Sequence, residues 1–422
     1  MKHIPVFILL FICLAFSLRA EEKTISLEEL IAEALQKNPA IQTAKNEVEG
    51  KKARIPQAGA LPDPEVSFGQ TNEESIVPFT NLGEADFSEI YVGFHQQFPL
   101  HGKRGLRERI AFSEAEAQTW MLEYAVRRLR AEVKLAFYDL YYWRRVQEIE
   151  RNNLALLEKF AATAEALYSV GKGNQADVLR AQTEISRLQD RLEMSQQQIG
   201  IHQARLNSLL FRSPDEQIGP LAPVERAAFH HSMDQLRQLA INDFPLLKHQ
   251  QEMTERSRLA AELAKKEKYP DVGLVFTYHN RGGLPDYWTI GGTTTLPLFA
   301  GRKQNKAVEE AQQDFMAAHR RYEDTLTMVN FELKNHYLSA LTADRLTQLY
   351  SQTIVPQETL SLEATIAAYT VGNVEFLSVL DSVEKLLQDE LRYWENFIEY
   401  QKALAKLENY AGIELTRSGG TP

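Results

Sequence analysis

The sequence of 422 residues contains one cysteine, Cys13, which lies in an apolar run from Ile4 to Leu18. The residue before it, Ile12, is too bulky for the usual lipoprotein cleavage motif, so we expect no lipid on Cys13. Without this segment the chain has no thiol and no disulfide. Its stability must then come from a large core or from an oligomer.

Apolar runs of membrane-spanning length are also missing. The run near the N-terminus is shorter than the roughly 18 to 20 residues of a spanning helix. With the basic Lys2 before it and the small Ala20 after it, it has the layout of a secretory signal peptide, which we expect to comprise residues 1–20. No later run reaches that length, so a mature chain that crosses a membrane must do so with strands in a closed barrel.

The chain has no excess of basic residues. It contains 47 Lys and Arg against 57 Asp and Glu, a net charge of −10. Removal of residues 1–20 takes away two basic side chains and no acid, which leaves 45 against 57 and a charge of −12. An acidic chain binds nucleic acid poorly, so we expect no nucleic-acid partner.

Motifs of common enzyme classes are absent as well. The sequence has no Walker A glycine spacing, no H-E-x-x-H and no nucleophile elbow. His230 and His231 form a conspicuous pair, but adjacent side chains point apart, which favours a surface or packing role over a metal site. We therefore expect no enzyme activity, no cofactor and no metal site.

What the chain does contain is an internal repeat. Its segments recur in the same order over about 150 residues, which indicates a duplication. The matched positions at an offset of 206 are Leu30, Pro39, Pro64, Glu65 and Val66 with Leu236, Pro245, Pro270, Asp271 and Val272. At an offset of 198 they are Val92, Gly93, Pro99 and Leu100 with Ile290, Gly291, Pro297 and Leu298. At an offset of 201 they are Tyr168, Val170, Gly171, Val178 and Leu179 with Tyr369, Val371, Gly372, Val379 and Leu380.

The two repeats have the same expected order of elements. Each begins with a short helix and a second helix, continues with two strands, and ends with a very long helix, a turn and another helix. We expect the first repeat at 21–215, a linker at 216–231, the second repeat at 232–415 and a flexible tail at 416–422.

Four segments alternate between apolar and polar residues, which marks strands with two different faces. In one of them Val272, Leu274 and Phe276 share a face. A soluble sheet packed on a core and a lipid-facing barrel both explain this pattern. The expected strands are Glu65–Gln70, Ile90–Phe98, Asp271–Tyr278 and Tyr287–Leu296.

The expected helices are unusually long. No proline occurs between Leu106 and Val170, and such a helix would reach about 100 Å. The matching segment, Arg302 to Thr370, contains Pro356, which should kink or break it. Alternating steps of three and four indicate coiled-coil seams. One seam comprises Val146, Ile149, Asn153, Leu156, Phe160, Thr163, Leu167 and Val170, and the other Ile185, Leu188, Leu192, Ile199, Leu206 and Leu209.

A similar junction leads from each strand pair into its long helix. Proline ends the strand ladder because it has no N–H, and glycine lets the backbone turn. The basic residue that follows would either meet lipid phosphates at the rim of a barrel or be solvated. The junction residues are Pro99, Gly102 and Lys103 in the first repeat and Pro297, Gly301 and Arg302 in the second.

Strands of about nine residues are long enough to cross a bilayer. The chain has four of them, whereas a closed barrel needs about eight strands. Open strand edges are not tolerated in lipid, so several chains must share one barrel. Closure alone permits a dimer with eight strands or a trimer with twelve.

This duplicated plan resembles the TolC-type outer membrane efflux channels, and the resemblance covers nearly the whole mature chain. The turn segments YSVGKGNQADVLRAQ and YTVGNVEFLSVLDS are typical of that family. The segments ALPDPEVSFG and HQQFPLHGKRGLR resemble its heavy-metal branch, the CusC/CzcC-like proteins. Many members of that branch have a lipoprotein motif, which this sequence lacks, so we expect no lipid anchor.

The resemblance implies a mixed α/β membrane protein that forms a homotrimer. Twelve strands would form one transmembrane β-barrel in the outer membrane of a Gram-negative bacterium, in contact with its lipid, and a long periplasmic α-helical coiled-coil barrel would continue it. It also implies a passive exit duct of a tripartite efflux system, with an inner-membrane RND-type pump and a periplasmic adaptor (membrane fusion) protein as partners. Heavy-metal cations are suggested as cargo by resemblance only.

By position in the family's motif, Asp177 and Asp381 match acidic residues that ring the closed tip of the tunnel, beyond the turns at Gly171 and Gly372. Pairing of these rings with Arg180 across neighbouring helix pairs would then hold the tip closed. The alternative is that they are ordinary exposed charges at helix starts. For the whole chain, a secreted structural or adhesive coiled coil explains the helices and leaves the repeated strand pairs unexplained.

Overall fold

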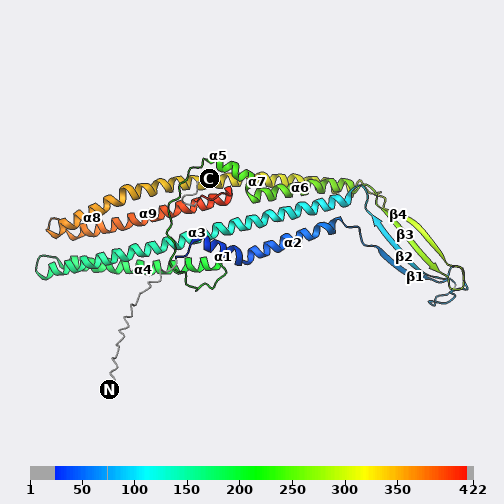
Figure 1. Ribbon diagram of the computed structural model, residues 1–422, viewed down its shortest axis with the longest axis horizontal. Helices are drawn as coiled ribbons and strands as arrows, with labels where there is room; N and C mark the ends of the chain where they lie inside the picture. The colour runs from blue at the N-terminus through cyan, green and yellow to red at the C-terminus, as the bar shows by residue number, and fades with distance from the viewer. Residues whose placement is uncertain (1–23, 74, 416–422) are drawn as a thin grey trace, which may run out of the picture.

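The computed structural model describes residues 24–73 and 75–415. The predicted signal peptide and the predicted tail lie outside the described residues. The described chain is elongated, with a small sheet at one end and the turns of two helical hairpins at the other (Figure 1). The first residues of α1 and the end of α9 lie near the middle of this length.

The elements follow one another in the same order in both halves of the chain. The first half contains α1 (Leu27–Lys37), α2 (Pro39–Gly59), β1 (Glu65–Thr71), β2 (Glu89–Phe98), α3 (Lys103–Ser169) and α4 (Gln175–Leu209). The second half contains α5 (Met233–Asp243), α6 (Pro245–Lys266), β3 (Val272–Asn280), β4 (Tyr287–Thr294), α7 (Gln304–Leu349), the π-helix η1 (Tyr350–Ile354), α8 (Val355–Thr370) and α9 (Phe376–Ala411).

Local sequence explains why the two short helices begin where they do. Ser26 accepts a hydrogen bond from the Glu29 N–H, and the Glu29 carboxylate accepts one from the Ser26 N–H. Ser232 and Gln235 form the same reciprocal cap before α5. Each cap satisfies backbone donors that a helix start leaves free. The two halves thus share this local chemistry as well as their order of elements.

The long helices agree with the sequence in length and differ from it in detail. The helix α3 comprises 67 residues and spans about 100 Å. In the second half, Pro356 lies in the first turn of α8, directly after the π-helical turn. Proline cannot donate the hydrogen bond that a continuing α-helix requires, and the wider turn accommodates this loss. The expected interruption at Pro356 is confirmed.

The predicted seam of α3 is wrong in its outer part. The structure buries Leu157 and Ala164, whereas Thr163 is exposed. From Val146 to Leu157 the buried positions of the seam advance by three, four and four residues, and the two successive steps of four give eleven residues in three turns rather than a heptad. A straight α-helix needs this longer period to keep one face inward. Val170, also assigned to the seam, is exposed beside the turn.

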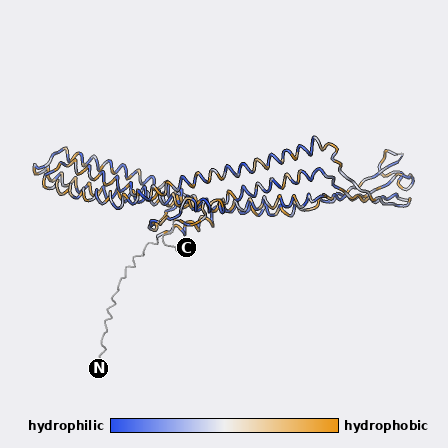
Figure 2. Tube along the Cα trace, turned by 90° about the horizontal axis from the view of Figure 1, so that it is seen from above, coloured by the Kyte–Doolittle hydropathy of each residue, from blue (hydrophilic) through white to orange (hydrophobic). Residues whose placement is uncertain are grey.

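The hydrophobic core follows the helices in three clusters. One joins α1, the middle of α3, the end of α4 and α9, and a second joins α5, α7 and α9. The third lies toward the hairpin turns, between α3, α4, α8 and α9. Hydrophobic and hydrophilic residues alternate along the helices, as expected when each helix buries one face (Figure 2). None of the described helices is long and apolar enough to cross a membrane.

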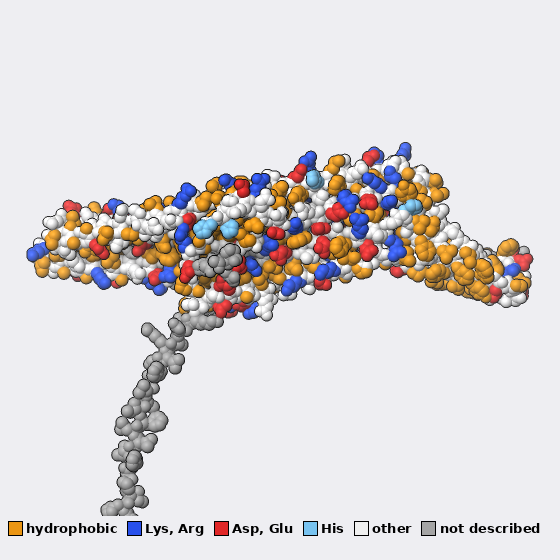
Figure 3. Space-filling view, turned by 45° about the horizontal axis from the view of Figure 1, so that its top comes forward, with side chains coloured by type: hydrophobic (Ala, Val, Ile, Leu, Met, Phe, Trp, Pro, Cys, Tyr) orange, Lys and Arg blue, Asp and Glu red, His pale blue; other side chains and the backbone are white. Residues whose placement is uncertain are grey.

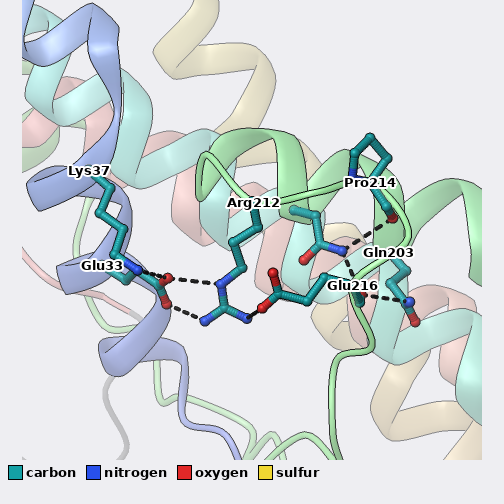
Figure 4. A network of polar contacts seen from close by, with 7 residues as sticks. Glu33, Lys37, Gln203, Arg212, Pro214 and Glu216 are labelled. Carbon is teal, nitrogen blue, oxygen red and sulfur yellow. Dashed lines mark hydrogen bonds and ion pairs between the residues drawn. The ribbon is translucent and has the colours of Figure 1, made fainter.

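A polar network near the middle of the molecule ties α1 to the segment after α4. The Arg212 guanidinium donates to both carboxylate oxygens of Glu33 and also pairs with Glu216 at 3.2 Å (Figure 4). The hydrogen bond from Arg212 holds the pKa of Glu33 at about 2, below its usual value of 4.5. The Asn207 amide donates to the main-chain oxygens of Pro214 and Glu216. These contacts fix the chain where it leaves α4.

The four strands form one antiparallel sheet in the order β1-β2-β3-β4. The two strand pairs therefore join edge to edge, with Phe94 opposite Phe276 and Phe98 opposite Val272. The predicted strands are confirmed to within two residues at each end. The outer strands β1 and β4 each keep one edge without a strand partner in the described chain.

Candidate functional site

One face of the sheet is apolar and exposed. Phe68 is 83% exposed and Ile290 is 60% exposed, although both belong to regular strands. Figure 3 shows hydrophobic side chains gathered over the sheet, while charged side chains are spread over the helical part. Exposed apolar surface of this extent on a sheet marks contact with lipid or another protein. The other residues of this face include Val66, Val92, Phe94, Leu274, Phe276, Tyr278 and Trp288.

The opposite face of the sheet is polar. Glu89 accepts a hydrogen bond from Tyr287 at 2.7 Å and lies 2.8 Å from the Nδ1 atom of His279. Nearer the helices, the His95 ring lies 3.3 Å from the Thr293 hydroxyl and 3.5 Å from Glu65. Tyr287 and Thr293 belong to β4 and reach β2 across the intervening strand β3, so hydrogen bonds cross this face of the sheet. The sheet thus separates an apolar side from a hydrogen-bonded polar side.

The first junction is a buried ion-pair site. The Lys103 ammonium donates to the Tyr269 main-chain oxygen at 2.8 Å and to Asp271 at 2.9 Å, and it lies 3.3 Å from Glu267. Its side chain is only 2% exposed. Our expectation that Lys103 meets lipid phosphates or water is therefore wrong. No local pattern in the sequence indicates that the partners of Lys103 come from the other half of the chain. Pro99 precedes this site, and Gly102 adopts a left-handed φ of 78° before α3.

The second junction differs from the first. Arg302 is exposed, and no ion pair joins it to another described residue. Leu298, which follows Pro297, is 81% exposed. Gly301 has no left-handed φ, so its expected role as a turn residue does not match that of Gly102. The spacer is longer by one residue here, and a helical turn over 299–303 makes the bend instead.

The two hairpin turns are built alike. Gly171 and Gly372 have φ of 72° and 78°, the left-handed conformation that favours glycine. The Gly171 N–H donates to the Tyr168 oxygen, and the next N–H, of Lys172, donates to the Leu167 oxygen. This is the Schellman arrangement, which ends a helix and reverses the chain within a few residues. Gly372 repeats the pattern after α8.

The residues beyond the turns share one groove of about 450 Å³ between α4 and α9. Arg180 and Asp381 both line it, but each pairs on its own helix. Arg180 lies 3.7 Å from Asp177, and Asp381 lies 2.7 Å from Lys385. The hydrogen bond with Asp381 raises the pKa of Lys385. The structure thus brings Arg180 and Asp381 into one groove without joining them within a protomer.

Asp177 lies close enough to the second hairpin for its charge to act on Tyr369. Burial raises the pKa of Tyr369, and the negative charge of Asp177 raises it further. Asp177 belongs to the first turn of α4 and Tyr369 to the end of α8, so the two hairpins are neighbours at their turns.

Residues 30–210 and 236–413 match the Outer membrane efflux protein family.

The chain belongs to the Outer membrane efflux protein family.

Solved structures of outer membrane proteins have the same fold as this member of the family. VceC from Vibrio cholerae is 20% identical with a TM-score of 0.78, and the match covers 92% of this chain and 96% of VceC. The open state of the MtrE outer membrane channel of Neisseria gonorrhoeae is 17% identical with a TM-score of 0.78, over 94% of this chain and 91% of MtrE. CusC, described for transmembrane channel formation, is 14% identical with a TM-score of 0.79, over 92% of each chain. Among curated proteins, no sequence matches this one.

This family member has groove residues that the sequence analysis missed. Arg191 on α4 lies 3.6 Å from Glu384 on α9, an ion pair that bridges the two hairpins. Glu184 and Arg187 line the same groove. Arg180, Glu184, Arg187 and Arg191 are spaced by three or four residues, which places them on one helix face. That spacing is a signal from which the charged face could have been predicted.

The histidine pair does not form part of a cluster of metal ligands. No group of three or more His, Cys, Asp or Glu that could hold a metal ion occurs among residues 24–73 and 75–415. His230 is exposed, and the half-buried His231 lies 6.1 Å from the ring of Phe229. The packing role expected from the sequence agrees with this contact of His231.

Proposed function

We propose that this family member is the outer membrane channel of a tripartite efflux system. In this role it is a passive exit duct through which an inner-membrane RND-type pump expels solutes, with a periplasmic adaptor protein between them. The sheet crosses the outer membrane, and the helical hairpins extend into the periplasm. Heavy-metal cations are the proposed cargo class, because two segments resemble the metal branch of the family.

The observation that carries this proposal is the two-sided sheet with two unpaired edges. The apolar face, on which Phe68 is 83% exposed, is not covered by any other part of the chain that the structure describes, and lipid is the natural partner for it. The hydrogen-bonded face around Glu89 and His95 suits a water-filled lumen. The edges of β1 and β4 need strand partners, because unpaired backbone groups are not tolerated in lipid.

We propose that a homotrimer satisfies these edges. Three copies supply twelve strands, each β4 pairing with the β1 of the next copy. The same symmetry arranges six helical hairpins around one axis as a coiled-coil barrel. A dimer would supply only eight strands, which leaves room for little besides side chains inside the barrel. A duct for solutes needs the wider trimer.

We propose that the hairpin turns form the gate of the duct. Threefold symmetry makes Asp177 and Asp381 into rings of three carboxylates around the axis, and such rings attract cations. Within residues 24–73 and 75–415 the only ion pair of Arg180 is with Asp177 on its own helix, so we assign a second partner to a hairpin of the neighbouring copy. Release of that pairing when the pump and adaptor dock would open the tip.

The proposal is tested on the protein extracted from outer membranes in detergent. Its mass should correspond to three chains by light scattering, and it should produce cation-selective conductance in planar lipid bilayers. A monodisperse monomer that stays soluble in water without detergent would contradict the barrel and the channel together.

A further inference from the structure

The strand pairing that joins the two halves of the protomer has an equivalent at the outer edges of the sheet. Only a second copy of the chain can complete that second pairing. Within the protomer, β2 of the first half pairs with β3 of the second half. By the repeat, β2 corresponds to β4, and β3 corresponds to β1. The uncovered edges of β4 and β1 are therefore the two sides of the same kind of contact.

The ion-pair site at the first junction also has an equivalent at the second junction. One copy of the chain does not complete this second site. Lys103 corresponds to Arg302, since each follows the glycine of its junction. Its partners Tyr269 and Asp271 correspond to Asp63 and Glu65, because both segments read X-Pro-acid-Val. The first site is complete within the protomer, and the halves of the second lie on opposite edges of the sheet.

Exposure separates the complete site from the incomplete one. The Asp271 side chain is 16% exposed, whereas that of Glu65 is 82% exposed. Leu100 is 37% exposed, whereas its equivalent Leu298 is 81% exposed. The basic residue shows the same difference, since Lys103 is buried and Arg302 is exposed. Each residue at the second site is exposed where its equivalent at the first site is covered by the other half of the chain.

We propose that Arg302 of one copy binds the Asp63 main-chain oxygen and the Glu65 carboxylate of the next copy, and that this contact sets the β4–β1 register. The inference rests on the proposed function, because it assumes that copies join edge to edge. Transferring the observed β2–β3 register through the repeat places Leu296 opposite Val66. It likewise places Thr294 opposite Phe68 and Thr295 opposite Ser67.

The transferred register keeps the two faces of the sheet continuous. Leu296 is 60% exposed and Val66 is 66% exposed, and both fall on the apolar side of the sheet. Thr295 and Ser67 fall on the polar side. A slip by one residue would place apolar residues of one copy beside polar residues of the next. The side-chain pattern thus agrees with the register obtained from the repeat and excludes a slip by one residue.

The register is tested by cysteine cross-linking in the outer membrane. The sequence has no cysteine after Cys13, so introduced thiols react without background. Residues opposite one another in an antiparallel pair lie about 4.5–5.5 Å apart at Cα, within disulfide range. The variant Ser67→Cys with Thr295→Cys should migrate mainly as a covalent trimer under non-reducing conditions. The control Ser67→Cys with Gly291→Cys lies four residues out of register, about 13 Å away, and should stay monomeric.

The ion pair is tested by charge reversal. Arg302→Glu should lower the dissociation temperature of the detergent-resistant trimer by more than about 10 °C, because like charges then face each other across the contact. Arg302→Lys should keep most of that temperature. Adding Glu65→Arg to Arg302→Glu should recover at least half of the lost dissociation temperature. No such recovery would occur if a lipid phosphate were the partner of Arg302.

The outcomes distinguish this inference from the proposed function. A parent protein that forms no closed oligomer would overturn both. If the parent is a trimer but the variant Ser67→Cys with Thr295→Cys does not cross-link, the inference alone is overturned. The same holds if Glu65→Arg does not rescue Arg302→Glu. A covalent ladder that ends at two chains would retain the register and overturn the trimer.

Discussion

The Lys103 ammonium and the Asp271 carboxylate lie 2.9 Å apart, although 168 positions separate them in the chain. Asp271 also accepts a hydrogen bond from the Leu100 N–H at 3.0 Å. The hydrogen bonds from Lys103 and Leu100 overcome the effect of burial and lower the pKa of Asp271. This contact joins the start of α3 to the start of β3 and so clamps the two halves of the protomer where helices meet sheet.

We expect Lys103→Ala to destabilise the protein by about 3–5 kcal/mol, the usual effect of removing one partner of a buried ion pair. The loss leaves the largely buried Asp271 without the cation that donates to it. Thermal unfolding in detergent, followed by circular dichroism, measures the change. Lys172→Ala, on an exposed turn, is the matched control and should stay within about 0.5 kcal/mol of the parent. Equal effects of the two variants would contradict the clamp.

The Glu33–Arg212 pair should make stability depend on acid. The folded pKa of Glu33 is about 2 and its usual value is 4.5, so the contribution is present above pH 4.5 and is lost as the pH falls toward 2. Arg212→Ala should cost about 1–3 kcal/mol at pH 7. The difference in free energy of unfolding between parent and variant should be smaller at pH 3 than at pH 7, as measured by denaturant unfolding. Lys37→Ala removes a more exposed partner of Glu33 and should have a smaller effect. A difference that is constant with pH would contradict the assignment.

The proposed topology places the loops between paired strands outside the cell and the hairpin turns in the periplasm. Glu84 and Pro285 are exposed in the two loops, and Lys172 is exposed at the first turn. Cysteines at Glu84 and Pro285 should react with an impermeant thiol reagent on intact cells. A cysteine at Lys172 should react only after the outer membrane is broken. The reverse pattern would invert the topology.

The gate proposal predicts two separate electrical effects. Arg180→Ala should raise the resting conductance in planar bilayers, because a tie between neighbouring hairpins is lost. Asp177→Ala combined with Asp381→Ala should weaken cation selectivity, because both carboxylate rings disappear. Lys385→Ala frees Asp381 without removing a carboxylate, so it should keep the selectivity. If the first two variants match the parent in conductance and selectivity, the constriction lies elsewhere.

Local patterns were sufficient to predict most elements of this chain. Period-two alternation located all four strands, and the absence of proline between Leu106 and Val170 indicated one long helix. The position of Pro356 predicted the interruption between α7 and α8. These features depend on neighbouring residues, whose spacing the sequence shows directly. The outer part of the α3 seam was missed because the eleven-residue step from Val146 to Leu157 shifts the buried positions out of the heptad.

The sequence by itself determined the elements, their duplicated order and the two-faced character of the strands. Only the tertiary structure decided that Lys103 is buried while its equivalent Arg302 is exposed. The two junctions share a residue pattern, so no local signal distinguishes them. The difference arises because residues far apart in the chain, such as Lys103 and Asp271, meet only when β2 pairs with β3. Whether a charge is buried depends on which distant segment covers it, and that is a property of the folded chain.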